Sequence, residues 1–199
     1  MKQIEITVRV KENVDEAIKK LEKQGFIKIR ESDIHDIYMT QLKNELKNDN
    51  IRYILSNCVL LRSFIVNGEK VKKITYKNKE YDNGKLISEK KVNVDCNDLE
   101  SAERLFEYLK FEKLVEVKYH VIVLEKDGVE FAFQDVENLG LLMEYESVID
   151  FENKSIDDIK QEKQKMYDFV KQTGLNITEE QDVQKAHELV NKIFGWKIV

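Results

Sequence analysis

The sequence predicts an α+β fold in which strands dominate the first 150 residues and helices dominate the remainder. Three observations support this prediction. Apolar and polar residues alternate in several segments, as they do in half-buried strands, and Asn-Gly or Asp-Gly turns connect three pairs of these segments. Later segments place apolar residues at helical spacing. We expect one domain, with the strands and two helices in residues 1–150 and two C-terminal helices in residues 151–199.

The first half of the chain begins with a strand pattern and a helix pattern. Ile4, Ile6, Val8 and Val10 alternate with polar residues, which predicts a strand. The next segment repeats apolar residues at helical spacing and stops at Gly25. The remaining expectations here are short strands at 26–29 and 34–39, a loop or short helix at 40–50, strands at 53–66, a hairpin turn at 67–68, a return strand at 71–79, a turn at 82–84 and a strand at 86–95.

The second half is expected to contain three more strands and three more helices. Asn97 or Asp98 caps a helix that presents Leu99, Ala102 and Leu105 on one face. Ser155 begins a later helix with a pattern that resembles a capping box. The expected ranges are a helix over 99–109, strands over 115–123, 129–133 and 142–148, a turn at 127–128, and helices from 155 to 174 and from 178 to 194.

The composition excludes several classes of protein. The 199 residues include no proline and only seven glycines, so proline-rich or glycine-rich linkers and collagen-like repeats are excluded. Charged residues make up 36% and hydrophobic residues 42%, and the formal net charge is −5. This apolar content argues against wholesale disorder. The acidic balance argues against a general nucleic-acid binder, which is usually basic.

The cysteines and the apolar segments indicate a cytoplasmic protein that does not enter a membrane. Cys58 and Cys96 form no CxxC pair, so neither a disulfide framework nor a zinc site is expected. Glu5 and Arg9 interrupt the apolar residues at the N-terminus, which is unlike a signal peptide. The most apolar stretch, residues 53–66, is too short to span a bilayer.

Charged residues recur two positions apart on the polar faces of the predicted strands. The simplest explanation is a sheet with one solvated face. If the sheet instead curls with this face inward, it forms a barrel whose charged interior requires paired charges or an ionic ligand. Lysine and arginine suit phosphate oxygens, and carboxylates suit Mg²⁺ or Mn²⁺. The residues in this pattern are Glu5 and Arg9; Lys73, Thr75, Lys77 and Lys79; Glu89 and Lys91; Lys118 and His120; and Glu144 and Glu146.

The local charge differs from the average charge of the chain. Residues 62–91 contain nine lysines and arginines against four acidic residues, a net of +5. Residues 144–199 contain eight against twelve, a net of −4. The middle of the chain is therefore suited to an anionic ligand although the whole chain is acidic.

The order of these motifs resembles the CYTH family, the triphosphate tunnel metalloenzymes, which include class IV adenylyl cyclases and thiamine triphosphatases. The resemblance covers nearly the whole chain. It consists of Glu5-Ile6-Thr7-Val8-Arg9 for the family's ExExK strand, Asp36-Ile37-Tyr38 for DxY, Leu61-Arg62-Ser63-Phe64 for LRxR, Thr75-Tyr76-Lys77 for TxK, Glu89-Lys90-Lys91 for ExE, Lys118-Tyr119-His120 for KxR, and residues 134–146 for the closing motif, which includes Leu139-Gly140 and Glu144-Tyr145-Glu146.

The resemblance implies both a fold and a site. The fold is an antiparallel β-barrel, or tunnel, of about eight strands with helices packed outside. The ligand is a small triphosphate compound bound with Mg²⁺ or Mn²⁺, which the enzymes of the family cleave or cyclise. A homodimer is compatible with the family. The implied phosphate-binding residues are Arg9, Arg62, Lys77, Lys118 and His120, and the implied metal-binding residues are Glu5, Glu89, Glu144 and Glu146.

Three departures from the family pattern keep two alternatives open. Thr7 replaces a carboxylate, Phe64 replaces a phosphate donor, and Gln134 replaces an acidic residue. The first alternative is a degenerate, non-catalytic module that binds nucleotide or polyphosphate without turnover. The second is an interaction domain with a solvated sheet face. We expect an adenylyl cyclase or a triphosphatase of the CYTH type, and the residues do not distinguish a cyclase from a hydrolase.

Overall fold

In the computed structural model, eight strands form one antiparallel sheet in the order β1-β8-β7-β6-β2-β3-β4-β5. The structure describes residues 4–66, 68–82, 85–147, 151 and 153–196. The expected number of strands is confirmed. The strands are β1 (Glu5–Arg9), β2 (Ile27–Thr40), β3 (Val59–Val66), β4 (Glu69–Asp82), β5 (Lys85–Asp95), β6 (Glu112–Lys126), β7 (Val129–Val136) and β8 (Gly140–Glu146).

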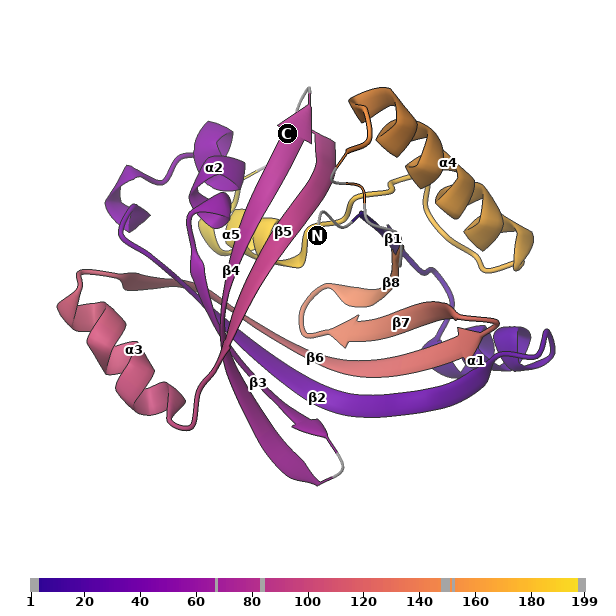
Figure 1. Ribbon diagram of the computed structural model, residues 1–199, viewed down its shortest axis with the longest axis horizontal. Helices are drawn as coiled ribbons and strands as arrows, with labels where there is room; N and C mark the ends of the chain where they lie inside the picture. The colour runs from indigo at the N-terminus through magenta and orange to yellow at the C-terminus, as the bar shows by residue number, and fades with distance from the viewer. Residues whose placement is uncertain (1–3, 67, 83–84, 148–150, 152, 197–199) are drawn as a thin grey trace.

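Five α-helices and two short 3₁₀ turns connect or follow the strands (Figure 1). The helices are α1 (Val14–Glu22), α2 (Ile51–Ser56), α3 (Leu99–Tyr108), α4 (Ile156–Gln172) and α5 (Lys185–Phe194), and the 3₁₀ turns are η1 (Lys43–Glu45) and η2 (Asn48–Asn50). Asp98 caps α3 and Ser155 caps α4 with a capping box, as the sequence predicts. None of the helices within the described residues has the length and hydropathy needed to cross a bilayer.

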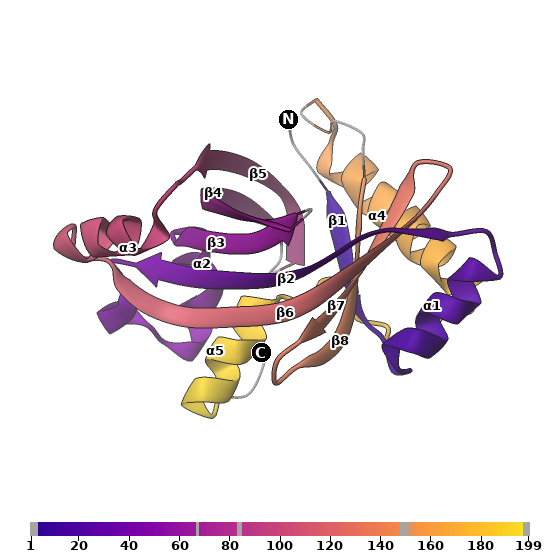
Figure 2. The same cartoon turned by 90° about the horizontal axis from the view of Figure 1, so that it is seen from below.

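The sheet is strongly curled into a half-barrel (Figures 1 and 2). Its two terminal strands, β1 and β5, approach each other across the concave side, where Lys91 Nζ on β5 lies 3.7 Å from a carboxylate oxygen of Glu5 on β1. Sheets twist and curl in this way when one face is covered by helices and the other encloses a cavity.

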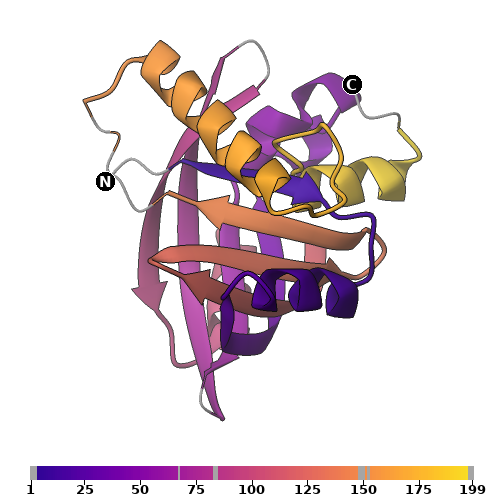
Figure 3. The same ribbon diagram turned by 90° about the vertical axis from the view of Figure 1, so that its right-hand side faces the viewer.

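The outer face of β1, β8 and β7 is apolar and is covered by α1 and α4 (Figure 3). Ile6, Phe133 and Met143 from the strands pack with Leu21 of α1 and Val170 of α4, and all five are at most 1% exposed. Each fully buried side chain of this size contributes about 1.5–3 kcal/mol of transfer free energy. The apolar strand faces therefore hold the helices outside, and the charged faces point into the half-barrel.

The helix α5 lies on the concave side, unlike α1 and α4. Leu189 and Val190 of α5 pack with Val117 and Val121 of β6 and with Ile54 of α2. This apolar contact occupies one part of the concave face, so the interior is charged toward β4, β5, β8 and β1 and apolar along β6.

The segment before α5 differs from the sequence expectation. A helix is expected from residue 178, but α5 begins only at Lys185. Residues 176–183 instead run along the outer edge of β1, where the Thr7 N–H donates to Gln181 O at 2.9 Å and the Val183 N–H donates to Thr7 O at 3.0 Å. These bonds satisfy part of an edge that would otherwise be unpaired. The sequence could not indicate this because the partner strand is about 175 residues away.

Two other expectations are corrected, and one turn is confirmed. Residues 26–29 and 34–39 belong to one long strand, β2, with an irregularity in its pairing to β6 after Lys28. Residues 53–56, expected to begin a strand, belong instead to α2. A short apolar run does not by itself distinguish a buried helix from a strand. Asp127 and Gly128 have φ of +52° and +80°, as a type I′ hairpin turn requires. Residues 67, 83, 84 and 148 of the expected turns and last strand lie outside the described residues.

Candidate functional site

The concave face of β4 and β5 carries most of the interior charge. Lys73, Lys77 and Lys79 alternate along β4 with residues that point outward, and the paired positions on β5 are Asp95, Lys91 and Glu89. Lys77 lies opposite Lys91, and Lys79 lies opposite Glu89. The period of two that is visible in the sequence thus places one row of amines on the inner wall.

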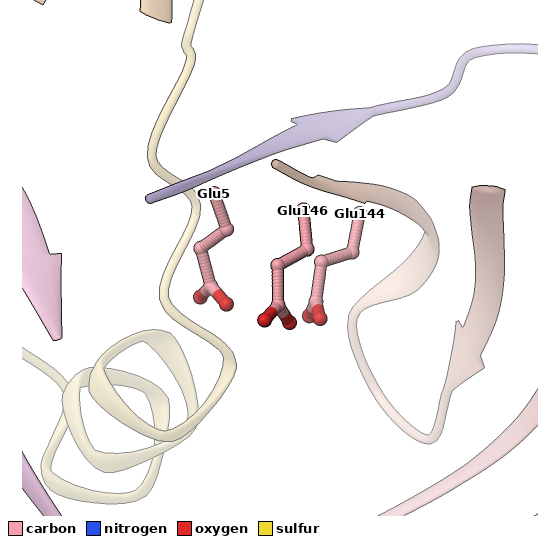
Figure 4. Close-up of side chains that lie close together, drawn as sticks. All are labelled: Glu5, Glu144 and Glu146. Carbon is pink, nitrogen blue, oxygen red and sulfur yellow. The ribbon is translucent and has the colours of Figure 1, made fainter. Parts of the chain in front are cut away.

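A cluster of three carboxylates lies on the facing wall, formed by β1 and β8. Glu5 is paired with Glu146, and Thr7 is paired with Glu144, so these side chains share one face. Figure 4 shows Glu5, Glu144 and Glu146 projecting to the same side of the two strands. One carboxylate oxygen from each lies within 4.8 Å of those of the other two. Thr7, directly opposite Glu144, stands where the pattern that the sequence resembles has a further carboxylate.

Lys91 links the two walls. Its Nζ lies 2.9 Å from Glu89 Oε1, 3.2 Å from Glu146 Oε2 and 3.7 Å from Glu5 Oε2. Lys77 Nζ donates to the same Glu89 Oε1 at 3.2 Å. Lys91 thus pairs with carboxylates of both walls, which offsets the cost of burying these charges.

Burial and neighbouring charges separate the pKa values of two carboxyl groups in the cluster. Burial raises the pKa of Glu5 to about 7, and repulsion from Glu144 and Glu89 adds to this against the attraction of Lys77 and Lys91. Burial also acts to raise the pKa of Glu144, but Lys185, Lys91 and Lys77 outweigh it and lower the value to about 2. The cluster therefore combines one carboxylate that stays ionised with one carboxyl that titrates near neutral pH.

A cavity of about 300 Å³ opens beside these residues. Its charged lining includes Arg30, Arg62, Lys73, Lys77, Lys91, Glu144 and Lys185. Apolar or aromatic surface comes from Ile34, Phe64, Tyr119, Val121 and Ala132. The charged faces of the strands thus enclose a cavity, which disfavours the interpretation of an interaction domain with a solvated face.

The structure brings together the residues expected to bind metal, with one qualification. Glu5, Glu144 and Glu146 form the cluster described above. Glu89 lies on the other wall, 1% exposed, where lysines surround it. Its Oε2 accepts no hydrogen bond within the described part of the chain. The three clustered carboxylates are hard oxygen ligands, the type that Mg²⁺ and Mn²⁺ prefer.

Two of the expected phosphate-binding cations are already engaged by carboxylates. Arg62 lines the cavity, but its Nε and Nη2 bind the two oxygens of Asp36, both at 2.7 Å. Arg9 binds Glu188 of α5 through Nη2 at 2.8 and 2.6 Å and donates from Nη1 to Leu139 O. Arg9 thus holds α5 against β1, whereas Lys77 lies inside the cavity as expected.

Lys118 and His120 do not point into the half-barrel, which corrects the expectation that they face a phosphate. The inward residue of this part of β6 is Tyr119, 6% exposed, so its two neighbours point outward. His120 lies between Glu31 and Asp33 on the outer surface, 2.9 and 2.8 Å from their carboxylate oxygens. Alternation places Lys118 and His120 on one face of β6, and the structure shows that this face is the outer one.

Lys185 is the interior residue that the sequence did not indicate. It is the first residue of α5, and its Nζ donates a hydrogen bond to Gln134 Oε1 and lies 3.5 Å from Glu144 Oε2. Gln134 in turn donates from Nε2 to Glu144 Oε2 at 3.1 Å. No periodic signal could have revealed Lys185, because its position depends on where α5 begins and against which strand it packs.

Comparison with known proteins supports the fold. No family profile matches the sequence. A Methanocaldococcus jannaschii protein named as a candidate adenylate cyclase is 25% identical over 188 residues, which cover 92% of this chain and 96% of that protein. A solved Pyrococcus horikoshii structure is similar with a TM-score of 0.71 and 22% identity, over 95% of this chain and 99% of the other.

A second similar structure comes from a protein whose name includes an activity. It is a Hippeastrum protein described as a candidate adenylyl cyclase with a dominant triphosphatase activity. The TM-score is 0.57 and the identity 12%, over 99% of this chain and 97% of the other. Together the matches confirm the expected α+β tunnel fold and the resemblance to the CYTH family.

Proposed function

We propose that this chain binds a triphosphate compound together with Mg²⁺ or Mn²⁺ inside the half-barrel and cleaves or cyclises it. The observation that carries the proposal is a three-glutamate cluster that adjoins a row of amines, with Glu144 of the cluster and Lys73, Lys77 and Lys91 of the row lining one cavity. The names of the Methanocaldococcus and Hippeastrum proteins agree with this chemistry.

The chain's own residues would bind and orient the substrate. Lys77 and Lys91 on the amine wall carry positive charge into the cavity, where charge-assisted hydrogen bonds to phosphate oxygens are strong. Glu5, Glu144 and Glu146 would hold the divalent cation. When bound, the cation neutralises phosphate oxygens and acts as a Lewis acid. In phosphoryl transfer most of the catalysis arises from such positioning and electrostatic stabilisation.

The test is to incubate the purified protein with ATP, thiamine triphosphate and tripolyphosphate, each with Mg²⁺ and with Mn²⁺. Cyclic AMP, pyrophosphate and phosphate are measured. We expect at least one substrate to be converted only with metal, and the double variant Glu144→Gln/Glu146→Gln to lose about 100-fold or more of that rate. Glu137→Gln, an exposed change outside the cluster, is the matched control. Absence of product from all three substrates would overturn the proposal.

The alternative function is a non-catalytic module that binds the same ligands. It is favoured by the extent to which interior charges are already paired, since Arg62 binds Asp36 and Lys91 contacts three glutamates. This alternative predicts an increase in Tm with tripolyphosphate or ATP and no product in the same samples. Turnover of any of the substrates would exclude it.

A further inference from the structure

Lys185 lies over a part of the inner wall to which β6 contributes no cation. The inward residues of β6 at this level are Val117, Tyr119 and Val121, all of them apolar or aromatic. Phe64 of β3 lines the same cavity. Lys185 reaches over this wall from α5, with its Nζ 4.6 Å from the centre of the Tyr119 ring. The ammonium therefore makes a cation–π contact with Tyr119, whose hydroxyl lies 3.4 Å from Arg62 Nη2.

The same ammonium group also neutralises one of the clustered carboxylates. Lys185 Nζ lies 3.5 Å from Glu144 Oε2, and Gln134 bridges the two by accepting from the lysine and donating to the glutamate. Glu144 is one of the three carboxylates that could hold a divalent cation. An ammonium and a divalent cation at this carboxylate would compete for the same negative charge.

The backbone of Lys185 is fixed while its side chain remains long enough to move. Glu188, one turn further along α5, is held by Arg9 of β1 through two hydrogen bonds. Leu189 and Val190 are buried against β6. The four-carbon stem of lysine can therefore redirect its charge within the cavity without displacement of the helix.

We infer that Lys185 is a tethered counter-ion that exchanges partners when ligands bind, an inference that rests on the proposed function. Without ligand it neutralises Glu144. A divalent cation takes over Glu144, and the released ammonium of Lys185 then binds a phosphate oxygen of the substrate. Lys185 thus supplies from α5 the phosphate-binding charge that β6 does not supply. It also couples the two binding events, so that binding of the metal strengthens binding of the triphosphate and the reverse.

This inference predicts opposite effects of one substitution on two ligands. In Lys185→Gln, Mn²⁺ alone should bind about three- to tenfold more tightly, because its competitor at Glu144 is gone. Tripolyphosphate, measured at saturating Mn²⁺, should bind about tenfold more weakly because a charged donor is lost. A merely structural defect in α5 would weaken the binding of both ligands. Isothermal titration calorimetry measures both affinities without reliance on turnover.

Two further variants make the result specific. Lys185→Arg keeps the charge and should keep tripolyphosphate affinity within about threefold of the wild type. Lys192→Gln removes an exposed lysine from the same helix and should change neither affinity. Circular dichroism and urea unfolding establish that each variant is folded.

The possible outcomes separate this inference from the proposed function. Suppose that the wild type binds both ligands and that Lys185→Gln changes the two affinities in the same direction or not at all. The role of Lys185 is then overturned, and the proposed function stands. If Lys185→Gln binds tripolyphosphate more tightly, Lys185 obstructs the site and the inference is equally overturned. If the wild type binds neither Mn²⁺ nor tripolyphosphate, the proposed function fails, and the inference fails with it.

Discussion

Replacement of Glu89 by glutamine tests the electrostatic interior independently of any ligand. Glu89 is 1% exposed, and its Oε1 lies 2.9 Å from Lys91 Nζ and 3.2 Å from Lys77 Nζ. Glutamine has the shape of the protonated acid but carries no charge. The substitution therefore leaves two half-buried amines without their common counter-ion, and we expect the folded state to be destabilised.

The magnitude follows from the pKa of Glu89 in the folded protein. Burial acts to raise this pKa, but Lys77, Lys91 and Lys79 outweigh it and lower the value from 4.5 to about 2. A carboxyl whose folded pKa is depressed stabilises the fold above its unfolded pKa and loses this effect as the pH falls toward the folded pKa. From this shift in pKa, we expect Glu89→Gln to lower the free energy of unfolding by about 3 kcal/mol at pH 7 and by about 2 kcal/mol at pH 3.5.

The assay is urea unfolding of the wild type and of Glu89→Gln, followed by circular dichroism at pH 7 and at pH 3.5. Glu137→Gln, which removes an exposed carboxylate, is the control. Its free energy of unfolding should lie within about 0.5 kcal/mol of that of the wild type. A loss below about 1 kcal/mol at pH 7 would refute the reasoning. So would a difference between wild type and Glu89→Gln that fails to shrink on acidification.

Three further predictions concern the buried arginine pair, a buried histidine and the altered phosphate wall. Asp36→Asn should lower the free energy of unfolding by about 3–5 kcal/mol, because it leaves the Arg62 guanidinium inside the barrel without its partner. Burial, with repulsion from nearby cations, lowers the pKa of His187 to about 4, so its neutral form stabilises the fold above pH 6.5. The free energy of unfolding should therefore fall by about 2 kcal/mol as the pH falls toward 4. The fall should be smaller in His187→Gln. Phe64→Arg adds a donor to the cavity wall and should increase tripolyphosphate affinity about three- to tenfold in calorimetry.

Each of these predictions has a contrary outcome. If Asp36→Asn changes the urea midpoint no more than a surface substitution does, the pair with Arg62 is not a buried interaction. If the acid sensitivity of His187→Gln equals that of the wild type, another group titrates in that range. Unchanged or weaker tripolyphosphate binding by Phe64→Arg would place the phosphate away from this wall.

The sequence predicted where most of the strands lie along the chain and which residues share a charged face. Alternation with period two needs only local information, so Lys73, Lys77 and Lys79 could be assigned to one face of β4 before their surroundings were known. The Asp127-Gly128 turn was likewise local, because positive φ at both positions suits these two residues.

The candidate site was predicted in part. Glu5, Glu144 and Glu146 were identified one by one, and antiparallel pairing of β1 with β8 brings them together. Lys118 and His120 were assigned to the wrong side, because alternation indicates which residues share a strand face but not which face turns inward. The neutralisation of Arg62 by Asp36 depends on the pairing of β2 with β3, which no single segment specifies.

The sequence by itself determined which residues are charged, which strand faces carry them and where the hairpins turn, because these properties depend on neighbours a few residues away. Only the tertiary structure decided which charges meet. Arg9 holds Glu188 across 179 residues, and Lys185 reaches Glu144 from a helix whose start was not predictable. Coulomb interactions depend on distance in space, and the curl of the sheet and the docking of α5 set those distances.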